Sequence, residues 1–180
     1  MKFFIDTTND FIALAIFDQN YVLVDYFLEK IVQKADVLPI KINDLLTKNN
    51  LKIQQINEFY LNLGPGKFTG CRIGLVFVRT ICQLSEAKLF TTNSFSIISV
   101  AFKEKRYYTI KNSNNSSFGA WAQQGTLVSE MEIINENIDN QGSFDYVYLF
   151  TNFKQAQTIF KQEKKLLQVE ALYLKDPKIN

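Results

Sequence analysis

The side chain best suited to chemistry in the first part of the chain is a carboxylate at the end of an apolar run. Asp6 follows residues 3–5, which have the length and composition of a buried strand. At such a strand end Asp6 could ligate Mg²⁺ with a second carboxylate. Three acidic residues are candidates for that second ligand: Asp10, Asp18 and Asp25. The hydroxyls of Thr7 and Thr8 could face a phosphate, but such hydroxyls more often satisfy the backbone of a turn.

A glycine-rich turn is the second candidate for chemistry. Gly64-Pro65-Gly66-Lys67 lacks the P-loop spacing, because Phe68 follows Lys67 and Leu61 stands five residues before Gly66. What remains is a strand-to-helix turn at a helix N-terminus, which either holds an anion or only turns the chain. The predicted glycine turn comprises Gly64, Pro65, Gly66, Thr69 and Gly70.

Composition excludes several classes of site. The 180 residues include no histidine, which rules out a Ser-His-Asp triad, a Cys-His dyad and every histidine-ligated metal site. Cys71 and Cys82, about 16 Å apart along one predicted helix, are beyond disulfide reach. A net charge of +2 does not argue for a nucleic-acid surface. Without a targeting signal or membrane span in the sequence, we expect a cytoplasmic protein.

Apolar periodicity places these candidates in a mixed α/β fold. Strands are predicted over residues 3–6, 11–17, 21–28, 58–63 and 89–91, and helices over residues 36–48, 69–84 and 93–101. Three strands in a meander, followed by alternating helices and strands, are the order of an RNase H-like domain. The predicted fold class is therefore an RNase H-like mixed sheet with flanking helices.

A change in composition near residue 100 suggests two lobes. Residues 1–100 would form the RNase H-like lobe, and residues 101–180 a smaller, degenerate second lobe with a C-terminal tail. Within the second lobe we expect strands at 107–110, 118–122 and 144–150, and a helix over 153–165.

The predicted helix 69–84 is apolar on two sides. Ile73, Phe77, Ile81 and Leu84 lie on one side, whereas Cys71, Leu75, Val78 and Cys82 lie on another. A helix of this kind must be buried on more than one face, either by the helix 36–48, by a partner protein, or by both. The residues predicted for a partner interface are Leu38, Ile42, Leu45, Cys71, Arg72, Leu75, Val78, Arg79 and Cys82.

Several segments resemble a known family. The opening Ile5-Asp6-Thr7-Thr8 resembles that of the ASKHA superfamily of actin, heat-shock 70 proteins and sugar kinases. Residues 64–74 are similar to the GPGSFTGLRIG signature of the TsaB/YeaZ family. Residues 90–95 and 172–177 are similar to two shorter family segments, whereas residues 101–168 match poorly. The histidine that the family commonly has before its first Leu-Pro is absent before Leu38-Pro39.

The resemblance implies a non-catalytic subunit of the bacterial complex that makes threonylcarbamoyladenosine beside the tRNA anticodon. Its partners would be a TsaD-like catalytic subunit and a TsaE-like ATPase. This chain alone would bind no cofactor, since ATP and metal belong to the partner subunits, and it would contact tRNA only through the complex. Asp6, Thr7 and Thr8 would then be a vestigial nucleotide site. Two alternatives stay open: an autonomous ASKHA-type ATPase or small kinase, and a homodimeric scaffold.

Overall fold

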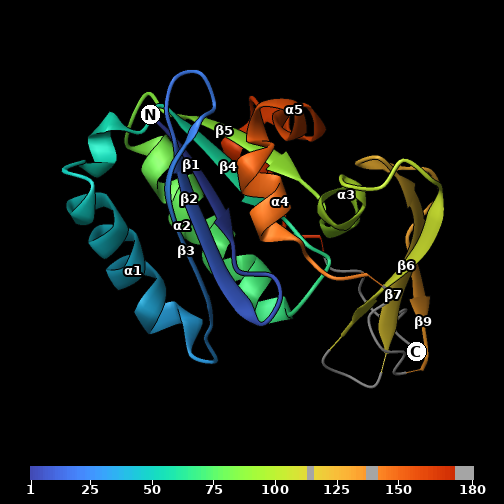
Figure 1. Ribbon diagram of the computed structural model, residues 1–180. Coiled ribbons are helices and arrows are strands. Elements are labelled where there is room, and N and C mark those ends of the chain that lie inside the picture. The colour runs from blue at the N-terminus through green and yellow to red at the C-terminus, as the bar shows by residue number, and fades with distance from the viewer. Residues whose placement is uncertain (113–115, 137–141, 173–180) are drawn as a thin grey trace.

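The protein is described by a computed structural model that covers residues 1–112, 116–136 and 142–172. Two sheets and their covering helices make up these ranges (Figure 1). The elements of the first half are β1 Lys2–Asp6, β2 Phe11–Phe17, β3 Leu23–Lys30, α1 Lys34–Lys48, β4 Glu58–Asn62, α2 Phe68–Gln83, β5 Lys88–Thr92 and α3 Ser94–Ser99. Those of the second half are β6 Arg106–Lys111, β7 Ser117–Gln123, β8 Thr126–Leu127, β9 Glu132–Ile134, α4 Tyr146–Thr151, α5 Phe153–Ala156 and β10 Lys161–Glu163.

The first sheet is mixed, with the strand order β10-β5-β4-β1-β2-β3. β1, β2 and β3 form the predicted antiparallel meander, whereas β4 runs parallel to β1 and β5 parallel to β4. The predicted mixed sheet with flanking helices is confirmed.

Alternation along the strands divides the core between the two faces of this sheet. Phe3 and Ile5 of β1 pack with buried residues of α1 and α2, whereas Phe4, between them, packs with residues of α4 and α5. Figure 1 shows these two pairs of helices on opposite sides of the sheet. On the α4 side the core is aromatic, and the rings of Phe17 and Phe153 stack 3.9 Å apart. Burial of both faces explains why β1 and β2 are apolar almost throughout.

The C-terminal third returns to the first sheet, which corrects two predictions. Residues 146–151 form the helix α4, not a strand, and the Asp145 carboxylate caps it by accepting a hydrogen bond from the Tyr148 N–H at 2.9 Å. The predicted helix 153–165 ends early, because residues 161–163 pair with β5 as the edge strand β10. A short apolar run does not by itself distinguish a buried strand from a buried helix.

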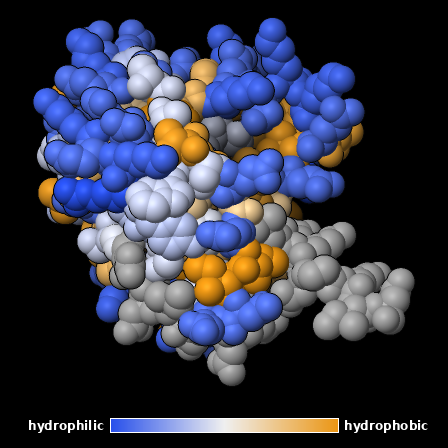
Figure 2. All heavy atoms as spheres, turned by 90° about the vertical axis from the view of Figure 1, so that its right-hand side faces the viewer, coloured by the Kyte–Doolittle hydropathy of each residue, from blue (hydrophilic) through white to orange (hydrophobic). Residues whose placement is uncertain are grey.

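The second sheet consists of β6, β7, β8 and β9, which confirms the strands expected at 107–110 and 118–122. It begins close to residue 100, as expected, but residues 146–163 belong with the first sheet and not with a second lobe that runs to residue 180. Figure 2 looks onto the side that carries the second sheet, where hydrophilic residues cover most of the described surface and hydrophobic ones form small separate patches.

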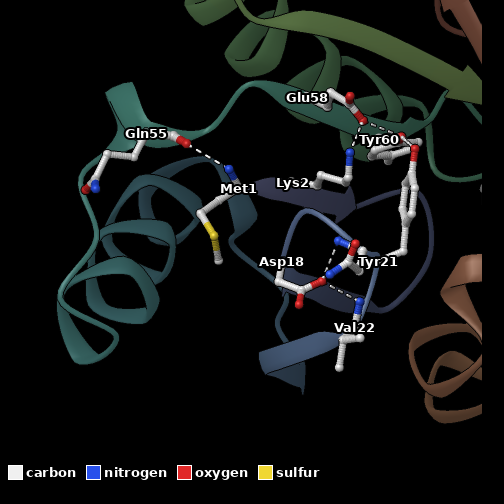
Figure 3. A network of polar contacts seen from close by, with 9 residues as sticks. Met1, Lys2, Asp18, Tyr21, Val22, Gln55, Glu58 and Tyr60 are labelled. Carbon is white, nitrogen blue, oxygen red and sulfur yellow. Dashed lines mark hydrogen bonds and ion pairs between the residues drawn. The ribbon is translucent and has the colours of Figure 1, made fainter.

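The two ends of the first sheet carry different polar groups. At the starts of β1 and β4, Lys2 and Tyr60 both donate hydrogen bonds to the Glu58 carboxylate, at 2.9 and 2.6 Å, and the Lys2 ammonium lies over the Tyr21 ring (Figure 3). The opposite end, where β1 and β4 finish, carries Asp6 and Asn62. None of the helices in the described ranges is long and apolar enough to cross a bilayer.

Candidate functional site

Asp6 lies fully buried at the end of β1, and protein donors occupy both of its carboxylate oxygens. The backbone N–H and the hydroxyl of Thr8 donate to Oδ1 at 2.8 and 2.7 Å. The Asn62 amide and the Tyr146 hydroxyl donate to Oδ2, each at 2.7 Å. A buried carboxylate needs such donors, and these four leave Asp6 with no oxygen directed to solvent.

Tyr146, the first residue of α4, closes the candidate nucleotide site from above Asp6. Its hydroxyl donates to Asp6 and accepts a hydrogen bond from the Asn9 amide at 2.5 Å. Burial, and after it the negative charge of Asp6, holds the pKa of this hydroxyl well above its usual value, so it remains a donor. A cation that approached Oδ2 of Asp6 would have to displace this hydroxyl.

The three carboxylates considered as a second metal ligand have other partners. Asp10 pairs with Lys67, and that hydrogen bond lowers the pKa of Asp10 despite partial burial. The Asp18 carboxylate accepts from the N–H groups of residues 20 and 22, and Asp25 pairs with Lys48 at 2.8 Å. Within the described ranges, no group of three Cys, Asp or Glu side chains is arranged to hold a metal ion. These contacts favour turn and surface roles for Asp10, Asp18 and Asp25 over a role as second ligand beside Asp6.

The glycine turn packs directly onto the turn that follows β1. A Cβ atom on Gly66 would lie 2.3 Å from the Thr8 carbonyl oxygen, and one on Gly70 would lie 2.1 Å from that of Thr7. The Lys67 N–H donates to the Thr8 carbonyl at 2.6 Å, and the Thr7 hydroxyl donates to the Gly70 carbonyl at 2.7 Å. The glycines thus allow two backbone segments to touch, which favours the turn-only alternative over an anion site. Thr69 is exposed beside them, and Pro65 is buried.

Most of the predicted partner interface lies in the core of this chain, and this prediction is corrected. Seven of its nine residues are at most 5% exposed and pack against the first sheet or between the helices. They are Leu38, Ile42, Leu45, Cys71, Leu75, Val78 and Cys82. Periodicity identified two apolar sides of α2, but it did not say which side faces the sheet.

The other apolar side of α2 faces outward, as one wall of a groove whose second wall is α1. Ile73, Phe77 and Ile81 are half-buried there, and Val76 is 53% exposed. Pro39 from α1 faces Val76 and Phe77 across two adjoining hollows of about 690 and 350 Å³. Leu38 and Ile42 contribute only to the floor of these hollows. This surface is called the α1–α2 groove below.

The two arginines predicted for the interface have different positions. The Arg72 guanidinium lies 3.9 Å from the centre of the Phe68 ring and borders the groove. Arg79 donates instead to the Val169 carbonyl at 3.3 Å and so contacts the segment that ends the described chain. Of the nine predicted residues, Arg72 is the one that remains exposed at the rim of the groove.

Comparisons with known proteins bear on the fold. No family model matches the chain. The uncharacterized protein MG208 homolog of Mycoplasma pneumoniae is 26% identical over 98% of this chain and 95% of its own length. The uncharacterized protein MG208 of Mycoplasma genitalium is 28% identical over 74% of this chain and 72% of its own. YeaZ from Pseudomonas aeruginosa superposes with a TM-score of 0.74 over 97% of this chain and 100% of that one, at 15% identity.

This chain has the fold of YeaZ. A second structure, an uncharacterized protein described as similar to peptidase YEAZ from Pseudomonas aeruginosa, gives a TM-score of 0.73 with the same coverage and identity. The resemblance to the TsaB/YeaZ family is thus confirmed at the level of the fold. The superposition covers 97% of the chain, so it extends beyond the segments that carry the sequence resemblance.

Within this YeaZ fold, sequence reasoning missed two sets of residues. Tyr146 and Asn62 donate to Asp6 from separate elements, and Asn9 donates to Tyr146. The signal for these partners was a carboxylate at the end of a buried strand with no lysine or arginine beside it in the sequence. Val76 and Pro39 line the groove that the seven core residues were expected to form. Gly70 and Gly74, four residues apart, indicated the inner side of α2, because glycine allows another backbone to approach a helix closely.

Proposed function

We propose that this protein is a TsaB/YeaZ-type subunit that performs no chemistry itself and pairs with a TsaD-like catalytic subunit through the α1–α2 groove. In this proposal the complex threonylcarbamoylates the tRNA adenosine beside the anticodon. ATP and metal are bound by the partner subunits, a TsaE-like ATPase joins the pair, and tRNA is contacted only through the complex.

The observation that carries the proposal is the outward apolar side of α2. Val76 of α2 is 53% exposed, and Pro39 lines the groove opposite it from α1. Half-buried Ile73 and Phe77 extend the apolar surface toward Val76. Apolar surface collected along two adjacent helices favours a partner that lays helices of its own against them, because association removes this area from water.

The state of Asp6 supports the absence of catalysis. Its two oxygens accept four hydrogen bonds, and Tyr146 stands in the approach to it. An ATPase or kinase that used Asp6 would first have to break the Tyr146 contact. The glycine turn is likewise filled by the Thr7–Thr8 backbone, which leaves no room for a phosphate between them.

Co-purification with a TsaD-like subunit tests the pairing. In the variant Val76→Glu a charge stands on the outward wall of the groove, and we expect the affinity for the partner to fall by about a hundredfold or more, since an unpaired charge would be buried on association. Folding should be unaffected, because the side chain is half exposed in the free chain.

Val147→Glu is the matched control, because Val147 is also 53% exposed but lies on α4, across the sheet from the groove. It should pair normally. Equal pairing by wild type and Val76→Glu would contradict the proposal. A dimer of this chain alone that Val76→Glu dissociates, with no binding to the TsaD-like subunit, would instead support the homodimeric scaffold. Hydrolysis of ATP by the purified chain would support the enzyme alternative.

A further inference from the structure

Lys34, the first residue of α1, is a buried lysine that takes no part in the hydrogen bonds of Asp6 or in the lining of the α1–α2 groove. Its side chain is 6% exposed, and its ammonium donates hydrogen bonds to three backbone carbonyls in the segment that joins β1 to β2. The acceptors are the carbonyl oxygens of Thr7 at 2.8 Å, Phe11 at 2.6 Å and Asn9. Within the described ranges Lys34 forms no ion pair.

Burial makes this placement unfavourable for a cation, whereas the three carbonyls and the nearby Asp6 carboxylate favour it. Burial lowers the pKa of Lys34 to about 8, and a positive charge in the first turn of α1 opposes the helix dipole. The charged and titratable groups that face it are Asp6, Asp10, Lys67 and Cys71. Asp10 is itself paired with Lys67, so these two largely offset each other. A methionine would fill the same space without a desolvated charge, so the ammonium is retained for its three N–H donors.

The three carbonyls surround the ammonium as they would a small free cation. An ammonium group has three N–H bonds, which match the three carbonyl acceptors in number, and its fourth bond is to the Lys34 stem. A hollow of about 450 Å³ opens beside it, lined by Lys34, Ala35, Lys67, Phe68 and Gly70 among others, so a small molecule could reach the place of the stem.

We propose that the carbonyls of Thr7, Asn9 and Phe11 form a binding site for a primary ammonium group, which Lys34 fills from within the chain. By filling it, Lys34 fixes the N-terminal end of α1 to the turn after β1. The same Thr7 carbonyl also contacts Gly70 of α2, so one peptide group sets the beginnings of both helices. Lys34 is thus a positioning residue for the α1–α2 groove, and this last step rests on the proposed function.

The test uses the full chain with Lys34→Ala, which removes Cγ, Cδ, Cε and Nζ, the atoms of propylammonium. Loss of the ammonium leaves three buried carbonyls without donors. We expect amide hydrogen exchange at residues 38 and 40–42, whose N–H groups bond within the first turns of α1, to speed up by about tenfold. Propylammonium chloride should restore at least a third of the lost protection. Tetramethylammonium chloride at equal ionic strength should restore none, because it has no N–H group.

Two further variants distinguish the loss of the ammonium group from the loss of side-chain volume. Lys34→Met should lose protection as Lys34→Ala does and should not respond to propylammonium, because its side chain fills the channel. Lys48→Ala is the matched control, since it removes the other lysine that anchors α1, an exposed one paired with Asp25. It should respond equally little to either salt. If Lys34→Ala does not fold, the yield of refolded chain in the two salts replaces hydrogen exchange as the measurement.

Equal effects of both salts, no effect of either, or a Lys34→Met variant as protected as the wild type would overturn the ammonium site. The groove is tested separately by the affinity of Lys34→Ala for the TsaD-like subunit, which should fall and recover with propylammonium. Rescue of exchange together with a wild type that binds no partner would contradict the proposed function and leave the ammonium site standing.

Discussion

The two long faces of α2 differ in the size of their side chains and in what covers them. The inner face has mostly small side chains, Gly70, Cys71, Gly74 and Val78, with Leu75 as a larger one, all buried against the first sheet and the turn after β1. The outer face has larger side chains, Ile73, Val76, Phe77 and Ile81, which α1 covers only in part. Small residues therefore lie where the chain's own backbone approaches, and large ones where the chain leaves apolar surface uncovered.

The difference separates what stabilises the fold from what is available to a partner. Close contact on the inner face leaves no room for added atoms, so substitutions there should change the free energy of unfolding. The outer face is already solvated in part, so substitutions there should change association more than folding. The four predictions below test this division, beginning with the largest expected effect.

Gly70→Ala should be the most destabilising single-atom addition on α2. The new Cβ would lie 2.1 Å from the Thr7 carbonyl oxygen, which is backbone and cannot rotate away. We expect a loss of about 3 kcal/mol or more in the free energy of unfolding, measured by urea denaturation, although alanine is otherwise the better helix former. Gly74→Ala is the graded comparison, because its Cβ would meet the Thr7 hydroxyl and a Leu61 methyl, which can move. A Gly70→Ala variant as stable as the wild type would refute the close contact.

The comparison also shows how much the sequence could predict. The β-β-β-α-β-α-β-α order and the doubly apolar helix follow from periodicity, because both faces of α2 are apolar and the strands are short and bounded by turns. Which face of α2 meets the sheet depends on tertiary packing. In the sequence, only the small size of Gly70 and Gly74 indicated the face that the rest of the chain approaches. The contacts of Asp6 with Tyr146, 140 residues away, and of Lys34 with the turn after β1 depend on long-range folding.

A matched pair of large-to-small substitutions tests the division directly. Leu75 lies on the inner face at 5% exposure, and Leu75→Ala should lower the free energy of unfolding by about 2–4 kcal/mol through loss of buried area and the cavity left behind. Phe77 is half-buried on the outer face, and Phe77→Ala should cost about 1 kcal/mol while weakening partner binding. Thermal and urea unfolding measure the first quantity, and titration with the TsaD-like subunit measures the second. Equal losses of stability would mean that the two faces do not differ.

Tyr146→Phe tests the hydrogen bonds of Asp6, which holds the turn after β1 against the inner face of α2. The substitution removes one donor from the buried Asp6 carboxylate and keeps the ring in the aromatic core. We expect the free energy of unfolding to fall by about 1–3 kcal/mol, because a buried charged acceptor loses a hydrogen bond. Partner binding should be unchanged, since Tyr146 lies across the sheet from the groove. Gain of Mg²⁺-dependent ATP binding by this variant, measured by calorimetry, would revive the nucleotide-site alternative.

The smallest expected effect is a dependence of stability on pH that Lys34 brings to the same turn. Burial lowers its pKa from the usual 10.5 to about 8 in the folded protein, so between these values the unfolded chain binds more protons. Stability attributable to Lys34 should therefore rise with pH across this window, by about 1 kcal/mol, because the carbonyl acceptors favour the charged form and reduce the shift. Urea unfolding of the wild type and Lys34→Met at about pH 8 and about pH 10 measures the difference, with Lys48→Met as the control for loss of one charge. The thiol of Cys71 is common to all three proteins, so its titration cancels in the comparison apart from its interaction with Lys34. The free energy of unfolding of the wild type minus that of Lys34→Met should therefore increase with pH. If it stays constant or falls, burial does not lower the pKa of the Lys34 ammonium in its contact with the turn after β1.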